Sequence, residues 1–113
     1  MSQLTTHILD TSKGKPAQGV TIKLEKPNDD GTWTVLGSGE TNADGRLPGL
    51  LKEGELLQPG NYRLVFYTAS YFNAQGVKGF YPTVTIDFET FDTSHYHVPL
   101  LLNPYGYSTY RGS

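Results

Sequence analysis

Apolar and polar side chains alternate in several short stretches of this chain, and turn-forming residues separate the stretches. The alternation is clearest in residues 20–25 and 83–89, where every second side chain is apolar. A period of two places these side chains on one face of a β-strand, whereas a helix needs apolar positions three or four residues apart. No stretch shows a long helical period. The pattern therefore predicts an all-β sandwich.

The turn signals between these stretches predict eight strands and one short helix. The expected strands cover residues 4–10, 20–25, 33–40, 46–47, 61–68, 83–89, 95–102 and 105–111. Residues 69–75 are expected to form the helix, which ends before Gly76 because glycine tolerates the conformation that often terminates a helix. Neither a repeat nor a linker interrupts the pattern, so residues 1–113 are expected to form a single domain.

The composition points to an assembly of several copies. Only 36% of the 113 residues are hydrophobic, which is low for a monomer that must cover its own core, and eight are tyrosines. Tyrosine suits both β-strands and protein interfaces. These features predict a homo-oligomer.

Charge and cysteine content exclude several classes of partner. The formal net charge is −2, and no basic cluster is present, so we expect neither nucleic acid nor a membrane surface as a partner. No apolar run approaches the length needed to span a bilayer. The chain contains no cysteine, so its stability is expected not to depend on disulfides.

The ends of the sequence predict a cytoplasmic protein. Residues 1–6 have neither the basic start nor the apolar run of a secretory signal. The last three residues, Arg111-Gly112-Ser113, are not a peroxisomal address of the Ser-Lys-Leu type. A peroxisomal location stays open if the source is eukaryotic.

Strand parity assigns the histidines to faces. In residues 95–102, the apolar positions 98, 100 and 102 are expected to face the core, which turns His95 and His97 outwards. In residues 4–10, His7 lies on the face opposite Leu4 and Ile8. A single outward histidine is usually an ordinary surface residue. Spacing alone does not bring His7 and His97 together.

Three runs of the sequence carry a family signature. They are LTTHILDTSKGKPA at residues 4–17, DGR at residues 44–46 and HYHVPLLLNPYGYSTYRGS at residues 95–113. Together these runs resemble the transthyretin-like 5-hydroxyisourate hydrolases, enzymes of urate breakdown. The resemblance extends over the whole chain.

The resemblance implies a fold, an assembly and a site. The fold is a two-sheet sandwich in which the first, fourth, seventh and eighth strands form one sheet. The outer face of that sheet lines a channel in a homotetramer, a dimer of dimers. The implied catalytic residues are His7, Arg46, His97 and Ser113, and the implied substrate-binding residues are His7, Arg46, Tyr110 and Arg111. The family needs no cofactor and no metal.

The implied reaction opens the N1–C6 amide bond of 5-hydroxyisourate to give 2-oxo-4-hydroxy-4-carboxy-5-ureidoimidazoline. Histidine titrates near neutral pH, so His7 and His97 suit water activation and proton transfer, in an order that the sequence leaves open. Arg46 suits the stabilisation of negative charge on a purine-like ring. Tyr110 and Ser113 would close the pocket. His95 shares the face of His97 but is expected to matter much less.

Three other classes of function remain to be weighed. A transthyretin-like carrier of thyroid hormone would have an open, apolar channel, and two histidines and an arginine argue against one. A zinc site is disfavoured because the three histidines lack the usual ligand spacing. The sandwich pattern also allows an adhesive immunoglobulin-like module, which the absence of a secretory signal disfavours.

Overall fold

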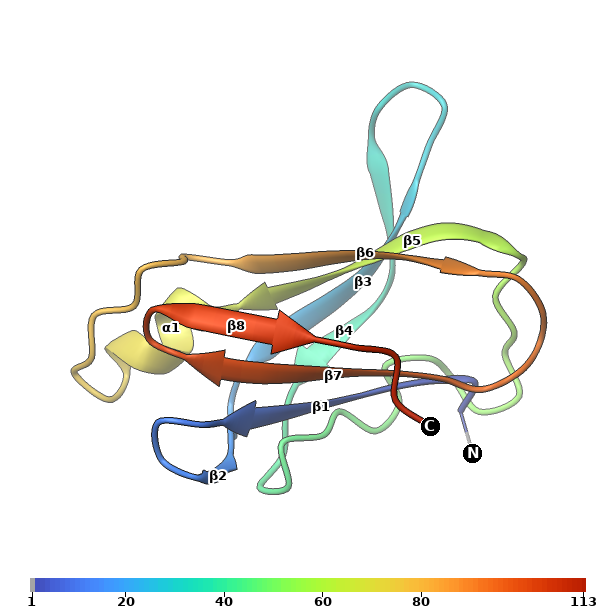
Figure 1. The fold of residues 1–113 in the computed structure, drawn as a ribbon. Helices are drawn as coiled ribbons and strands as arrows, with labels where there is room; N and C mark the ends of the chain where they lie inside the picture. Colours follow the sequence, from blue (N-terminus) through green and yellow to red (C-terminus); the bar gives the residue numbers. More distant parts are fainter. Residues whose placement is uncertain (1) are drawn as a thin grey trace.

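Two four-stranded β-sheets form the protein. The computed structural model describes residues 2–113. One sheet contains, in spatial order, β2 (Lys15–Pro16), β1 (Leu4–Asp10), β7 (Tyr96–Asn103) and β8 (Gly106–Thr109). The other contains β4 (Trp33–Glu40), β3 (Thr21–Pro27), β5 (Gly60–Tyr67) and β6 (Val84–Thr90), and α1 (Thr68–Asn73) follows β5. Figure 1 shows the sheets as two layers, with the chain ends at the same end of the sandwich. The predicted all-β sandwich with one short helix is confirmed.

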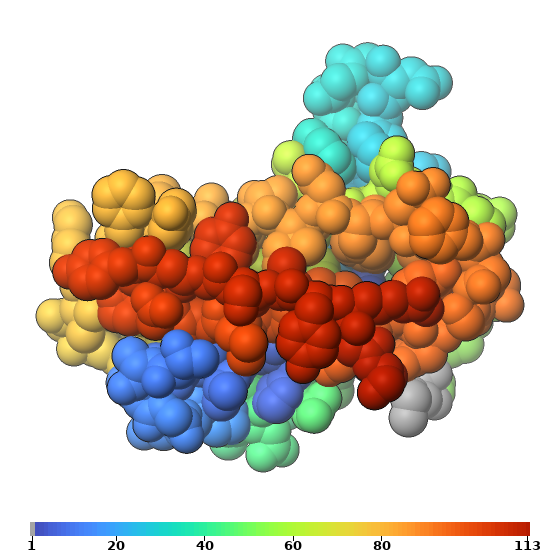
Figure 2. Space-filling model, viewed as in Figure 1, coloured from blue at the N-terminus to red at the C-terminus, as the bar shows by residue number. Residues whose placement is uncertain are grey.

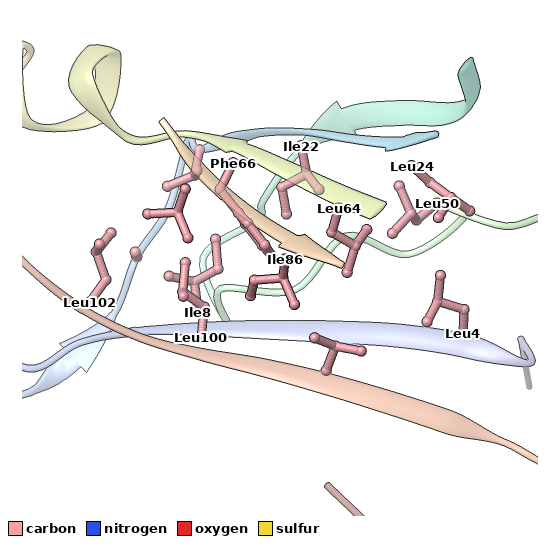
Figure 3. Close-up of a cluster of buried hydrophobic side chains, with 14 of the residues drawn as sticks. Leu4, Ile8, Ile22, Leu24, Leu50, Leu64, Phe66, Ile86, Leu100 and Leu102 are labelled. Atoms are coloured by element: carbon pink, nitrogen blue, oxygen red, sulfur yellow. The ribbon is translucent and has the colours of Figure 1, made fainter. Parts of the chain in front are cut away.

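The core lies between the sheets and receives every second side chain of each inner strand. In β1, Leu4, Thr6 and Ile8 are buried, while the residues between them are half-buried. Figure 3 shows side chains from β1, β3, β5, β6 and β7 meeting in this layer. Each fully buried aliphatic or aromatic side chain contributes roughly 1.5–3 kcal/mol to stability. The face assignment of His7 and His97 is confirmed, because both are half-buried on strands whose alternate side chains form the core.

A buried polar contact fixes the end of β1 against α1. Asp10 is fully buried and accepts hydrogen bonds from the Tyr71 hydroxyl at 2.7 Å and the Ser12 hydroxyl at 2.5 Å. Burial raises the pKa of Tyr71 to about 12, and Asp10 adds to this shift. Tyr71 therefore stays neutral, and its hydroxyl donates a hydrogen bond to Asp10.

Two short elements differ from the sequence prediction. Residues 46–47 do not form a strand; Arg46 makes a single antiparallel bridge to His7 instead. The edge strand beside β1 is β2, which was not predicted and pairs Lys15 with Asp10. Both segments are too short to show alternation, so periodicity could not identify them.

The last strand is shorter than predicted because of a proline in its partner. In the β7–β8 register Leu100 pairs with Thr109, so Pro99 stands opposite Tyr110. Proline has no N–H to donate to a neighbouring strand. Regular pairing therefore ends at Thr109 and returns only as a bridge between Gly112 and His97.

The helix content of residues 2–113 does not meet what a membrane span requires. No helix in this part of the chain is long and apolar enough to span a bilayer.

Candidate functional site

Parallel pairing of β1 with β7 brings the N-terminal and C-terminal histidines onto one surface. The register places Thr5 beside His97 and His7 beside Pro99. Since side chains two residues apart share a face, the outward side chains of both strands form one continuous outer face. His7, His95 and His97 all lie on it, each half-buried.

A tight turn carries Arg46 to the same place. The side-chain oxygen of Asn42 accepts hydrogen bonds from the backbone N–H groups of Asp44 and Arg46 at 2.9 and 3.2 Å. Gly45 has φ +74°, and a Cβ there would collide with the Ile8 carbonyl. The Ile8 N–H donates to the Gly45 carbonyl at 2.9 Å. Glycine is needed at this position because it alone allows both the backbone angle and the close approach to β1.

The guanidinium of Arg46 is exposed and has no hydrogen-bond or ion-pair partner among residues 2–113. Arg46 is therefore held at β1 by its backbone, while its charge stays available for another molecule. A planar cation with five N–H donors binds carboxylates and other planar anions well.

Thr5 connects two of the histidines, and the sequence analysis gave it no role. Its hydroxyl lies 2.9 Å from His95 Nε2 and 2.8 Å from His97 Nδ1. The two imidazole rings are stacked, with centroids 6.4 Å apart and planes 14° apart. Parity already placed Thr5 on the face of His7, but only the parallel register of β1 and β7 puts it between His95 and His97.

The C-terminal tail lies against His97. The Gly112 N–H donates to the His97 carbonyl at 2.8 Å, and a Cβ on Gly112 would come within 2.5 Å of His97 Cδ2. Tyr110 is 58% exposed and Ser113 is exposed. Figure 2 shows the tail (red) on the surface next to the N-terminal strand (blue). The tail thus brings Tyr110 to the histidine face and leaves the side chains of Tyr110 and Ser113 open to other molecules.

Arg111 is placed differently from the other predicted site residues. Its guanidinium carbon lies 4.4 Å from the ring centroid of Tyr96, a core residue, and its Nη2 donates to the His95 carbonyl at 3.4 Å. In the β7 register, Arg111 stands opposite the inward-facing Val98. These contacts hold it at the edge of the sandwich rather than beside His97.

The surroundings of His97 favour its neutral form. Burial lowers the pKa of His97 below 6.5, and the nearby charges of Arg46, His95 and His7 lower it further. His97 therefore carries an unprotonated nitrogen at neutral pH. Its Nε2 makes no hydrogen bond within residues 2–113.

A cavity of about 300 Å³ opens beside this group and includes Thr5, Arg46, Pro48 and Gly49 in its wall. A larger cavity of about 470 Å³, between the β1–β2 connection and α1, contains none of the predicted site residues. We therefore locate the candidate site by its chemistry, on the outer face of β1 and β7.

The part of the chain that the structure describes contains no group of three or more His, Cys, Asp or Glu side chains arranged to hold a metal ion. The expectation of a reaction without metal stays a prediction.

Comparison with known proteins identifies the family. A family model described as the HIUase/Transthyretin family matches residues 4–112. The curated 5-hydroxyisourate hydrolase of Salmonella typhimurium is 49% identical over 111 residues, which cover 97% of this chain and 80% of that protein.

Solved structures agree with the family match. The 5-hydroxyisourate hydrolase of Klebsiella pneumoniae superimposes with a TM-score of 0.84 and 39% identity, covering 100% of this chain and 94% of the other. Sea bream transthyretin in complex with thyroxine gives a TM-score of 0.90 and 34% identity, covering 98% and 95%. With a family model and full-length relatives in agreement, this chain belongs to the HIUase/Transthyretin family.

Proposed function

We propose that this protein is a 5-hydroxyisourate hydrolase of urate breakdown, which opens the N1–C6 amide bond of its substrate. The curated relatives named for this activity match nearly the full chain. The observation that carries the proposal is the group formed by His7, Arg46 and His97, whose free nitrogens share one surface. The product is 2-oxo-4-hydroxy-4-carboxy-5-ureidoimidazoline.

The geometry supports a division of roles among these residues. Neutral His97 takes a proton from water as the water oxygen attacks C6, and the carbonyl oxygen becomes negative. Arg46 stabilises that negative charge and orients the ring. When the C6–N1 bond breaks, N1 receives a proton from a protonated histidine, a role open to His7 and His97. Atoms balance, because one water is added across one bond.

The proposed catalytic and binding residues beyond this group come from the tail. Ser113 and Tyr110 would donate hydrogen bonds to the substrate and close the pocket. Arg111 keeps its predicted part in substrate binding only if its contact with Tyr96 is given up, so we expect its contribution to be smaller.

We propose that the active form is a homotetramer, a dimer of dimers, with the site in a channel between copies. Arg46, Tyr110 and Ser113 are exposed in one chain, and a second copy over this face would cover them and exclude water. Light scattering tests this point. A stable monomer of 12.5 kDa at assay concentrations would contradict a shared channel.

A transthyretin-like carrier is the second candidate, because the sea bream protein solved with thyroxine has the same fold. The fold therefore does not separate the two functions. The free nitrogens on the outer face favour catalysis, since an apolar hormone channel would leave them without partners. Thyroxine binding measured by calorimetry, without hydrolysis, would favour the carrier.

The direct test is the decay of freshly generated 5-hydroxyisourate, followed in the near-UV. The protein should accelerate the decay, and the His97→Ala variant at the same concentration should not. Equal rates with and without protein would refute the proposed function. The cytoplasmic location stays a prediction, which cell fractionation would test.

A further inference from the structure

The Thr5 hydroxyl couples two histidines of the outer face. It lies within hydrogen-bond distance of His95 Nε2 and His97 Nδ1 and has no other partner among residues 2–113. A hydroxyl carries one proton, so it donates to one ring and accepts from the other. If both rings donated to it, its own proton would have no acceptor, which is costly for a part-buried group. The protonation of one ring therefore fixes that of the other.

We propose that Thr5 holds His97 in the Nδ1–H tautomer, which leaves Nε2 as the base, and relays a proton from His97 to His95 during the reaction. This inference rests on the proposed function and deepens it. It also revises the expectation that His95 matters little.

In the resting state, His97 Nδ1–H donates to Thr5 and the Thr5 hydroxyl donates to His95 Nε2. His95 then carries its own proton on Nδ1. The nitrogen that a ring uses is set by the hydrogen bond at its other nitrogen. With Nδ1 committed to Thr5, His97 keeps an unprotonated Nε2 that makes no hydrogen bond within residues 2–113.

The relay step conserves protons and charge. After His97 Nε2 accepts a proton from water, His97 is a cation. Its Nδ1 proton then moves to the Thr5 oxygen as the Thr5 proton moves to His95 Nε2. Thr5 ends with one proton, as it began, and the positive charge has passed from His97 to His95. His97 is again neutral and carries the water proton on Nε2. When the C6–N1 bond breaks, the relay runs back: His95 Nε2 returns its proton to the Thr5 oxygen, the Thr5 proton moves to His97 Nδ1, and His97 Nε2 gives its proton to N1. All three groups then have the protons of the resting state.

The surroundings of His97 favour the departure of its extra proton. Arg46 and His7 stand near His97 and disfavour a cation there, as does burial. Both rings are half-buried, and the two hydrogen bonds to Thr5 are short, so no water is needed between them.

Nitrogen NMR of the histidine rings tests the tautomer without substrate. The chain has three histidines, so single His variants assign all ring signals. At a pH above the His97 titration, we expect a protonated Nδ1 on both His97 and His95. The Thr5→Val variant keeps the side-chain shape, removes the hydroxyl and should release His97 into a mixture of tautomers. Thr5→Ser should restore the wild-type pattern.

A matched control removes a different threonine hydroxyl, which binds β7 from the residue that follows β1. The Thr11 hydroxyl donates to the Leu102 carbonyl at 3.3 Å, away from the site. Thr11→Val should leave the histidine signals and the hydrolysis rate unchanged. This separates the loss of the relay from the general loss of a threonine hydrogen bond to β7.

Kinetics test the relay itself. Thr5→Val should lower kcat by about tenfold with little change in KM, a smaller loss than the roughly 10²–10⁴-fold expected for removing the base. His95→Phe keeps a flat ring without nitrogens and should cause the same loss. The double variant should be no slower than either single variant, because both changes break one chain of hydrogen bonds.

Several outcomes would overturn the inference. They are an Nε2–H tautomer for His97 in the wild type, an unchanged tautomer in Thr5→Val, an unchanged kcat, or a rise in KM alone. If Thr5→Val does not fold, as judged by circular dichroism, His95→Phe carries the kinetic test and the wild-type spectrum carries the tautomer test. A wild-type protein that hydrolyses no 5-hydroxyisourate would refute the proposed function, while the NMR result would still decide the role of Thr5.

Discussion

Arg46 and Arg63 lie on the outer faces of the two sheets. They differ in whether the guanidinium group has a partner within the chain. The Arg63 Nε donates to Glu25 Oε1 at 2.6 Å, and its guanidinium carbon lies 3.6 Å from the ring centroid of Trp33. Arg46 has an exposed guanidinium with no partner among residues 2–113. Both follow an ordinary strand or turn pattern, so only the family signature at residues 44–46 singles out Arg46.

The difference separates a structural face from a functional one. On the β4–β3–β5–β6 sheet, Arg63 and Glu25 bind each other, and Lys23 lies over the ring of Tyr67. On the β1–β7 face, Arg46 and the free nitrogens of the histidines have no hydrogen-bond partner within residues 2–113, so they are available to bind another molecule. Leaving such groups unpartnered gives up stabilising contacts, so it is expected where the partner is a substrate or another copy.

Alanine substitutions in the unpartnered group should have the largest effect of all. We expect His7→Ala and His97→Ala each to lower kcat/KM by roughly 10²–10⁴-fold, because an acid–base group is lost. Arg46→Ala should cost about 10²–10³-fold through lost charge stabilisation. The thermal midpoint should barely change, since none of these side chains is in the core. Wild-type turnover by the His97→Ala variant would show that the unpartnered group on the β1–β7 face does not carry the activity.

Deleting residues 110–113 should also remove most hydrolysis while keeping the sandwich. The tail is exposed apart from its bond to His97 and the contacts of Arg111, so few core contacts disappear. Circular dichroism and the decay assay measure the two effects together. An active truncated protein would show that residues 110–113 are not needed for hydrolysis.

A single methyl group should disturb the site through His97. Gly112→Ala places a Cβ within 2.5 Å of His97 Cδ2, so the ring must move. A shift of about 1 Å in a reacting group can cost about 10²-fold in rate. The matched control is Gly106→Ala on β8, where the nearest atom to a Cβ is 3.7 Å away in Asn103. Equal hydrolysis rates for Gly112→Ala and Gly106→Ala would show that the position of His97 does not affect the reaction.

The partnered arginine should show the reverse pattern. Arg63→Ala leaves Glu25, which is 8% exposed, without its charged partner, and should lower the free energy of unfolding by about 1–3 kcal/mol. Hydrolysis should stay unchanged. Lys23→Ala removes a more weakly held cation and should cost at most about 1 kcal/mol. Urea denaturation and the decay assay, applied to the wild type and the two variants, measure both effects. An Arg63→Ala variant that lost activity but not stability would contradict this prediction.

The smallest effect is a shift in titration. Burial and the charge of Arg46 hold the pKa of His97 below 6.5, so the rate should fall with acid only below that pH. Arg46→Gln should raise this pKa towards 6.5, as seen by proton NMR of the His97 ring. Because the unfolded chain binds this proton more readily, the free energy of unfolding should fall as the pH drops from 6.5 to the folded pKa. An unchanged titration in Arg46→Gln would mean that the arginine does not act on His97.

The sequence alone determined the layers of the sandwich and the faces of its strands. Alternation in β1 and β7 turned His7 and His97 outwards, because a period of two admits only two faces. The family signature at residues 4–17, 44–46 and 95–113 added the activity and the candidate site residues, and the roles of those residues stay a prediction. The fold class, the family and the face assignment are confirmed.

Tertiary structure decided which of these residues meet. Only the parallel register of β1 with β7 places Thr5 between His95 and His97. Only the turn at Gly45 sets Arg46 against β1 as a bridge rather than a strand. Partners far apart in the chain leave no local trace, because a strand's pattern records which face is buried and not which strand lies beside it. For the same reason the alternation of apolar and polar residues could not distinguish Arg46 from Arg63; only the family signature at residues 44–46 did so.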